Sequence, residues 1–247
     1  MLYNLDFFFA CHRGKIRKTN QDNYVCGQDY LPPDHESITA PALKSFLPEA
    51  PFLLAVFDGM SGEACGEMAS WIAADTFHNW NLQRGETSLT EGCLESNRRI
   101  AQYAQRHRLK SCGTTAAMLL FDSAGIVRCN IGDSRIYRIR NNKPELLSEA
   151  DVFPAAGKRK HYLLQHLGIP ESEMAIQPHT ERYGAVDGDV YLICSDGLSD
   201  VVPEEKITGI VRNTTIEKAG RGLLRSALDA GGPDNITFFL VRIRKNE

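Results

Sequence analysis

Short apolar runs alternate with polar segments along most of the chain and predict a mixture of strands and helices. Seven of these runs have the length of strands, at residues 3–9, 52–57, 114–121, 126–130, 134–139, 189–194 and 236–243. Those between 114 and 139 follow one another so closely that they predict a meander of antiparallel hairpins.

Four other segments carry apolar residues at helical spacing and predict helices that pack on a sheet. The first covers residues 64–80, where core packing explains the aromatic residues better than a cofactor site does. The second begins at a capping box, Ser88 to Glu91, and runs to about residue 110. Shorter helices are predicted after Pro203 and after a second capping box at Thr214.

Two segments show neither the apolar pattern of a strand nor that of a helix. Residues 27–51 contain five prolines and predict a long irregular loop. The polar run at 11–25 is typical of a solvated hairpin loop. Because neither a linker nor an internal repeat interrupts the chain, we expect one compact domain over residues 1–247.

Composition narrows the class of protein. The net charge of −3 argues against a nucleic-acid binder, and no apolar stretch is long enough for a membrane span. The seven cysteines form no C-x-x-C pair and lie mostly in apolar runs. They predict reduced, buried thiols in a cytoplasmic protein.

Several acids lie at the ends of the predicted strands. Asp58 and Asp196 each close an apolar strand and precede glycine, Asp234 comes just before a strand, and Asp133 lies between two strands. A single Asp-Gly pair is most often a turn. Repeated carboxylates of this kind favour a site for a divalent cation, because a buried carboxylate needs a cation or several donors.

Carboxylates from strand ends, next to glycines, suit magnesium (Mg²⁺) or manganese (Mn²⁺), which prefer oxygen ligands. Two such ions about 3.5–4 Å apart can activate a water molecule and hold a phosphoryl group. Arg17 is the candidate side chain for binding a phosphate through its guanidinium group.

Six motifs connect these residues. They are Arg17 with Asn20-Gln21-Asp22, Asp58-Gly59-Met60-Ser61-Gly62, Gly113-Thr114-Thr115, Asn130-Ile131-Gly132-Asp133-Ser134-Arg135, Ser195-Asp196-Gly197-Leu198 with Asp200, and Asp234-Asn235-Ile236-Thr237. In this order, over nearly the whole length, the chain resembles the metal-dependent (type 2C) serine/threonine protein phosphatases of bacterial type.

The resemblance implies an α+β fold, a four-layer αββα sandwich of two antiparallel sheets flanked by helices. It also implies two Mn²⁺ or Mg²⁺ ions, with Asp58 bridging both and the Gly59 carbonyl binding one of them. Asp196 and Asp234 would hold the other ion, and Asp22 would act through a bound water. Asp133 with Asp196 matches the place where some bacterial members bind a third ion.

The activity implied is hydrolysis of phosphoserine and phosphothreonine by a hydroxide that bridges the metals, with Arg17 holding the phosphate. The partners implied are phosphoproteins and an opposing serine/threonine kinase, and a monomer is expected. Cys194 is then a buried apolar residue rather than a nucleophile. The alternatives are a phosphatase-like binding or scaffold module without turnover, and a hydrolase of small phosphoesters.

The chain departs from the family pattern in two places. Ser61 stands where glycine is usual. Between 146 and 168 the helical flap that borders the active site in bacterial members is predicted to be much shorter. Both departures lie close to the predicted metal site and therefore bear on substrate preference.

Overall fold

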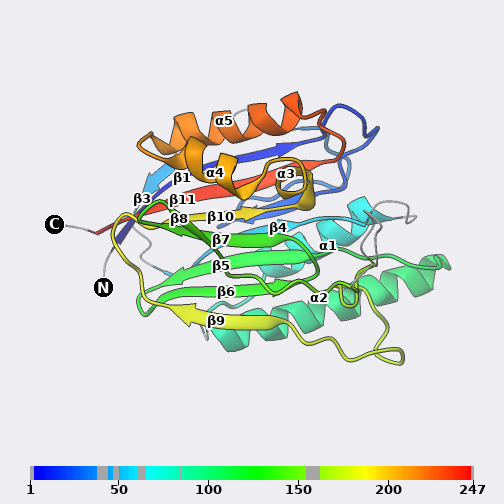
Figure 1. Cartoon of the computed structure of the whole chain (residues 1–247). Coiled ribbons are helices and arrows are strands. Elements are labelled where there is room, and N and C mark those ends of the chain that lie inside the picture. The colour runs from blue at the N-terminus through cyan, green and yellow to red at the C-terminus, as the bar shows by residue number, and fades with distance from the viewer. Residues whose placement is uncertain are drawn as a thin grey trace.

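The computed structural model describes residues 3–37, 44–46, 50–60, 65–83, 85–153 and 162–245. Within these ranges, eleven strands form two antiparallel sheets that pack face to face (Figure 1). Sheet A has the order β3 (Lys44–Phe46), β1 (Tyr3–His12), β11 (Ile236–Lys245), β10 (Val190–Cys194), β7 (Arg135–Arg140) and β8 (Lys143–Leu146). Sheet B has the order β2 (Asn23–Cys26), β4 (Phe52–Phe57), β5 (Ala116–Asp122), β6 (Gly125–Ile131) and β9 (His179–Tyr183).

Helices cover the outer face of each sheet (Figure 1). Sheet B carries α1 (Gly66–His78) and α2 (Glu86–His107). Sheet A carries α3 (Asp196–Ser199), α4 (Glu204–Val211) and α5 (Ile216–Asp229). The predicted four-layer αββα sandwich is therefore confirmed.

The phenylalanine run in β1 shows how the layers are held together. Successive side chains of a strand point to opposite faces. Phe7 and Phe9 accordingly lie in the core between the sheets, where both contact Phe239. Phe8 lies on the other face, where it stacks on Phe238 beneath the helices. A strand buried on both faces must be apolar throughout, which explains the continuous run.

One part of the predicted meander is wrong. β5 and β6 do form a hairpin, but the next strand of sheet B beside β6 is β9. β7 belongs to sheet A, where it pairs with β10. The chain crosses between the sheets at Gly132, whose φ of +95° favours glycine. This crossing places Asp133 in the turn that links the two sheets.

The capping boxes are placed only partly as predicted. Ser88 lies buried inside α2, whose N-cap is Gly85 without a side-chain hydrogen bond. The N-cap of α5 is Thr215, one residue beyond the predicted Thr214, and its side chain accepts from the Lys218 amide. The helix after Pro203 begins as predicted, with Pro203 as the N-cap of α4.

The expectation that all seven cysteines are thiols is wrong for one pair. Cys65 and Cys112 form a disulfide with Cα atoms 5.4 Å apart. The other five, Cys11, Cys26, Cys93, Cys129 and Cys194, are free and buried, as predicted. Cys65 lies between β4 and α1, and Cys112 lies between α2 and β5. The disulfide therefore links these two connecting segments.

Two loop predictions fall partly outside the described residues. The segment 27–51 is interrupted by β3, which pairs with β1 at Leu5 to Phe7, so it is not wholly irregular. In the segment 146–168 the structure describes 146–153 and 162–168, which meet through a bridge between Val152 and Leu163. The predicted shortening of the flap and the effect of Ser61 rest on residues that lie outside the described ranges.

Close packing of α5 on β1 yields a stability prediction. A Cβ atom added at Gly220 would lie 2.2 Å from Cδ1 of the buried Phe8. We expect Gly220→Ala to lower the free energy of unfolding by about 2 kcal/mol, because overpacking outweighs the better helix propensity of alanine. Urea denaturation measures the change.

The matched control is Gly209→Ala on α4, where an added Cβ atom has no neighbour within 4 Å. This variant should gain up to about 1 kcal/mol from helix propensity alone. Equal effects of the two substitutions would contradict the packing assigned to α5.

Candidate active site

Strand pairing brings the predicted acids to one end of the sandwich. In sheet A, Cys194 at the end of β10 pairs with Arg135 at the start of β7 and with Phe238 near the start of β11. Asp196 therefore lies near both Asp133 and Asp234. In sheet B the end of β4 pairs with the start of β2, through Phe57 and Asn23. This register places Asp58 beside Asp22.

Electrostatic coupling shows that the five carboxyl groups act on one another. Burial raises the pKa of Asp58 well above its ordinary range, and the charges of Asp22, Asp196, Asp133 and Asp234 raise it further. Like charges that are desolvated together resist ionisation. The chain thus assembles acids from five separate segments into one field of negative charge.

Asp196 and Asp22 share this environment. Burial, then the charges of Asp133 and Asp234, raises the pKa of Asp196 to about 8. Burial likewise raises the pKa of Asp22 to about 7, although the hydroxyl groups of Thr237 and Ser195 oppose the shift. The Ser195 hydroxyl donates to Asp22 Oδ2 at 2.9 Å and so fixes the orientation of this buried side chain.

Arg17 is the cation at the site. Its Nη2 atom lies 2.5 Å from Asp234 Oδ2, and this hydrogen bond is the largest cause of a raised pKa at Arg17. The charges of Asp196 and Asp58 contribute in the same direction. The side chain is 36% exposed, so a ligand can reach the guanidinium group from solvent.

The loop that carries Arg17 is held by Asn235. The Asn235 side chain accepts from the amide of Gln21 at 2.8 Å and donates to the carbonyl oxygens of Arg13 and Thr19 at 2.8 and 3.0 Å. Sequence reasoning named Asn235 only as part of a motif and missed this role. A buried asparagine that follows a candidate ligand was the signal, because a buried amide must find partners.

Two glycines permit the close approach of these loops. At Gly14, with φ of +81°, an added Cβ atom would lie 2.2 Å from the Asp234 carbonyl oxygen. At Gly59 it would lie 2.4 Å from the carbonyl oxygens of Gln21 and Gly66. The role of the Gly59 carbonyl as a metal ligand stays a prediction.

His12 and Cys194 have structural roles. His12 Nδ1 accepts from the Gly14 amide at 2.9 Å and supports the same turn, and burial lowers its pKa. Cys194 is fully buried in the apolar core beneath the helices, where burial raises its pKa to about 12. A thiol that stays protonated is a poor nucleophile, and the burial of Cys194 in this core agrees with the packing role expected for it.

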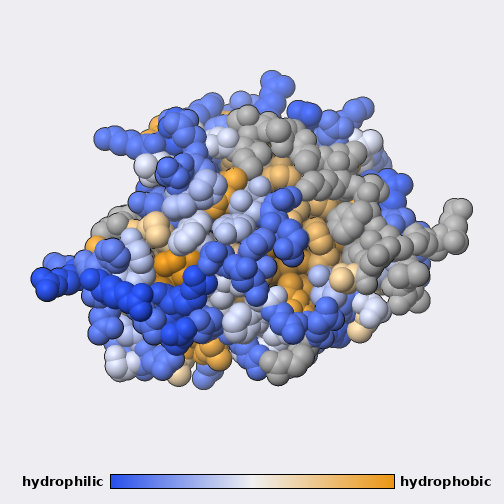
Figure 2. All heavy atoms as spheres, turned by 180° about the vertical axis from the view of Figure 1, so that it is seen from behind, coloured by the Kyte–Doolittle hydropathy of each residue, from blue (hydrophilic) through white to orange (hydrophobic). Residues whose placement is uncertain are grey.

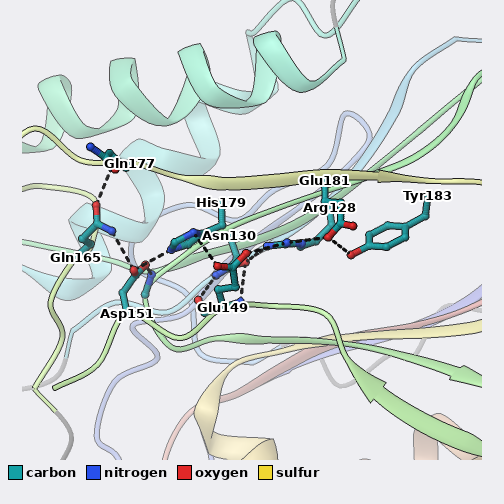
Figure 3. A network of polar contacts seen from close by, with 10 residues as sticks. Arg128, Asn130, Glu149, Asp151, Gln165, Gln177, His179, Glu181 and Tyr183 are labelled. Carbon is teal, nitrogen blue, oxygen red and sulfur yellow. Dashed lines mark hydrogen bonds and ion pairs between the residues drawn. The ribbon is translucent and has the colours of Figure 1, made fainter. Parts of the chain in front are cut away.

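The Asp133 loop is braced by a network that sequence reasoning missed (Figure 3). Asp151 Oδ2 accepts from the Gly132 amide at 2.9 Å, and the Asp151 amide donates to the Gly132 carbonyl oxygen at 3.0 Å. Asp151 Oδ1 in turn lies 2.9 Å from both Gln165 Nε2 and His179 Nε2. These contacts join β9 and the 162–168 segment to the turn that carries Asp133.

The network continues along β6. Arg128 is only 3% exposed and pairs with Glu149 and Glu181, and its Nη1 atom donates to Asn130 Oδ1 at 2.9 Å (Figure 3). Asn130 Nδ2 donates to the Glu149 carbonyl oxygen at 2.7 Å. A buried arginine with several acceptors fixes the relative positions of the strands that supply them.

The donor set fits hard divalent cations. Every predicted side-chain ligand is a carboxylate, and buried Asp22 Oδ1 has no hydrogen-bond partner among the described residues. Within those residues no three acidic, histidine or cysteine side chains form a ligand cage by themselves. Ions that share carboxylates and keep several waters do not require such a cage.

A family model described as Protein phosphatase 2C matches residues 42–230. The chain belongs to the protein phosphatase 2C family. The matched segment contains Asp58, Asp133 and Asp196, whereas Arg17, Asp22 and Asp234 lie outside it.

Relatives in this family match most of the chain. A protein of Listeria welshimeri named serine/threonine phosphatase stp is 28% identical, with 94% of each chain covered. The serine/threonine protein phosphatase PstP of Mycobacterium tuberculosis is 32% identical over 77% of this chain and 40% of its own length. A structure of the PstP catalytic domain in complex with two manganese ions has 26% identity and a TM-score of 0.76, covering 99% of this chain and 100% of that one.

None of the helices in the described part of the chain combines the length and apolar character that crossing a bilayer requires. Seen from the side opposite to Figure 1, the surface is mainly hydrophilic, with separate areas of apolar residues between (Figure 2).

The raised pKa of Asp22 predicts how pH affects stability without metal. A carboxyl group whose folded pKa is about 7, against an ordinary value of 3.8, stabilises the fold when protonated. The free energy of unfolding in EDTA should therefore fall as pH rises from about 4 to above 7. Asp22→Asn should weaken this fall. The free energy of unfolding of this variant should exceed that of the wild type by about 2 kcal/mol at pH 8, but should not exceed it at pH 5.

Urea denaturation at several pH values measures this difference. The control is Asp229→Asn at the exposed end of α5, which should follow the wild-type profile. A parallel shift of the Asp22→Asn curve at all pH values would argue against a buried, protonated carboxyl group.

Proposed function

We propose that this protein is a metal-dependent phosphoprotein phosphatase that hydrolyses phosphoserine and phosphothreonine side chains. The observation that carries the proposal is the meeting of five carboxyl groups and one arginine at the same end of a protein phosphatase 2C sandwich. The named phosphatase from Listeria welshimeri, similar over 94% of the chain, supports the same activity.

The proposed cofactors are two Mn²⁺ or Mg²⁺ ions, and the manganese complex of the PstP catalytic domain supports them. Asp58 would bridge both ions, with the Gly59 carbonyl on one and Asp196 and Asp234 on the other. Asp22 would contribute through a water, and Asp133 with Asp196 is the place where a third ion would bind if the site takes one. When bound, the ions supply an activated water and neutralise charge on the phosphoryl group.

The chain's own residues prepare this chemistry. The hydroxyl group of Ser195 orients the buried Asp22 carboxyl, and Asn235 holds the loop that presents Arg17. The guanidinium group of Arg17, held by Asp234 on one side, would bind two oxygens of the substrate phosphate and align it for in-line attack.

The proposal also covers the domain organisation, oligomeric state, location and partners of the enzyme. We propose one catalytic domain over residues 1–247 that acts as a monomer in the cytoplasm, opposes a serine/threonine kinase and binds neither nucleic acid nor membrane. The net charge of −3 supports the absence of nucleic-acid binding.

Activity is the first test. With Mn²⁺ the purified protein should hydrolyse p-nitrophenyl phosphate and phosphothreonine peptides, and EDTA should remove both activities because the carboxylates alone cannot activate water. Phosphate release measures turnover. If neither substrate is hydrolysed with Mn²⁺ present, the proposed function is wrong, whereas preference for nucleotides or sugar phosphates would indicate a small-molecule hydrolase.

Asp58→Asn should abolish turnover, because the same carboxylate is proposed to bridge both ions and position the attacking water. Steady-state kinetics with Mn²⁺ measures the loss. Asp229→Asn on α5 is the control for removing a carboxylate elsewhere. Normal turnover in Asp58→Asn would exclude the proposed ligand set.

Arg17→Ala should chiefly raise KM, by roughly 10- to 100-fold, because a charge-assisted contact to the substrate phosphate is lost. The matched control is Lys18→Ala, which removes an exposed positive charge from the next position. A KM change of the same size in both variants would show that the loop's overall charge matters rather than the guanidinium group of Arg17.

A further inference from the structure

A polar cavity lies at the opposite end of sheet A from the acids. Its volume is about 610 Å³, and its floor includes Ile139, Val190 and Arg242 from β7, β10 and β11. β11 begins two residues after Asp234, and Arg242 lies six residues further along it. At about 3.3 Å per residue, the cavity is roughly 25 Å from the candidate active site.

The cavity exists because the sheet extends beyond its helices. Residues 238 and 240 of β11 point into the apolar core beneath α4 and α5, and strand alternation sends Arg242 and Arg244 to the same face. This end of the sheet is where β11 runs toward the C-terminus in Figure 1. Because α5 only begins here, it does not cover this part of the sheet face, which is left open.

The walls are built from two tight turns. Asn141 and Asn142 form the two-residue turn between β7 and β8, with φ of +52° and +58°. Asn213, with φ of +52°, leads from α4 toward Thr215 at the start of α5. All of them line the cavity and add amide and hydroxyl groups that can donate hydrogen bonds.

The charge of the cavity is positive. Lys218, Arg242 and Arg244 line it, and no carboxylate is among the residues that do so in the described part of the chain. Arg244 forms an ion pair with Asp6 of the neighbouring strand β1. Arg242 Nη2 donates to the Thr214 carbonyl oxygen at 3.1 Å, which orients the guanidinium group under the start of α5.

Two guanidinium groups lie close together here, and the Asp6 carboxylate is paired with one of them. Burial, and then the charge of Arg244, lowers the pKa of Arg242, whereas Asp6 offsets the shift only in part. A bound anion would relieve the repulsion between the two guanidinium groups. Planar guanidinium groups bind the paired oxygens of phosphate, and the positive start of α5 adds to the attraction.

We propose that this cavity, bounded by Lys218, Arg242 and the Asn141-Asn142 turn, is a second binding site for a phosphoryl group. The group comes either from free phosphate or from a phosphorylated side chain on a protein. The site is separate from the metal-binding end and requires no metal ion, so it is independent of the proposed hydrolysis.

The test is a titration followed by nuclear magnetic resonance in EDTA, which prevents turnover. Inorganic phosphate at constant ionic strength should give saturable shifts of the amides at 141–142 and 213–218. The double variant Lys218→Gln/Arg242→Gln should weaken this binding by at least roughly tenfold, because two charged contacts are lost. The shifts are local to the cavity, so phosphate bound near Arg17 is not mistaken for them.

The matched control is Arg106→Gln/Lys110→Gln, which removes one arginine and one lysine from exposed positions in the last turn of α2 and just after it. This control variant should bind inorganic phosphate as tightly as the wild type does. Lys218→Gln alone tests the site without disturbing the Arg242 hydrogen bond to Thr214, and it should weaken binding by roughly threefold.

A second titration separates the two sources of the phosphoryl group. A phosphoserine peptide that binds more tightly than inorganic phosphate, and more tightly than its unphosphorylated form, identifies a phosphorylated protein segment as the ligand. Binding of inorganic phosphate at least as tight as that of the peptide identifies free phosphate. Shifts that do not saturate, or that are equal in both double variants, overturn the proposal.

Discussion

The repulsion among carboxyl groups gathered at one end of the sandwich is the constraint on which the site depends. Asp58 is surrounded by four other acids, and burial makes the charges of Asp58, Asp22 and Asp196 costly. Such a cluster is stable only if protons or cations neutralise it. The raised pKa values of Asp22 and Asp196 show the first solution, and binding of divalent cations is the second. Repulsion among the carboxylates destabilises the metal-free fold. Cations that bind relieve this repulsion, so the same term contributes to metal affinity.

The surrounding structure keeps these groups in place against their repulsion. Ser195 and Asn235 hold Asp22 and the Arg17 loop through hydrogen bonds, while Asp151 holds the Gly132 turn from the other side. Each of these residues belongs to a different segment, and each satisfies its polar atoms by bracing a loop. The candidate site is therefore held together by residues that are not themselves predicted ligands.

The two ends of sheet A carry opposite charge. β11 starts beside Asp234 and ends with Arg242 and Arg244, so one strand joins a negative end to a positive one. Both ends can attract phosphoryl groups, the first through bound cations and the second through arginine and lysine directly. A separation of about 25 Å lets the two act on different groups of one ligand or on different ligands.

Local patterns predicted most elements and the identity of the candidate site. Apolar runs located β1, β4, β5, β10 and β11, and the motifs around Asp58, Asp196 and Asp234 were enough to indicate metal chemistry. The edge strands β2, β3, β8 and β9 were missed. β8 and β9 are short and mostly polar, and β2 has only four residues, so none of them carries a clear periodic pattern.

The sequence by itself determined which apolar runs form the core and which loops carry acids, since hydrophobic spacing and turn chemistry depend on neighbouring positions. Only the tertiary structure decided that β7 joins sheet A, that Arg17 meets Asp234 and that Cys65 pairs with Cys112. It also decided that Arg242 opens into a cavity. These outcomes depend on contacts between residues far apart in the chain, for which hydrophobic periodicity carries no information.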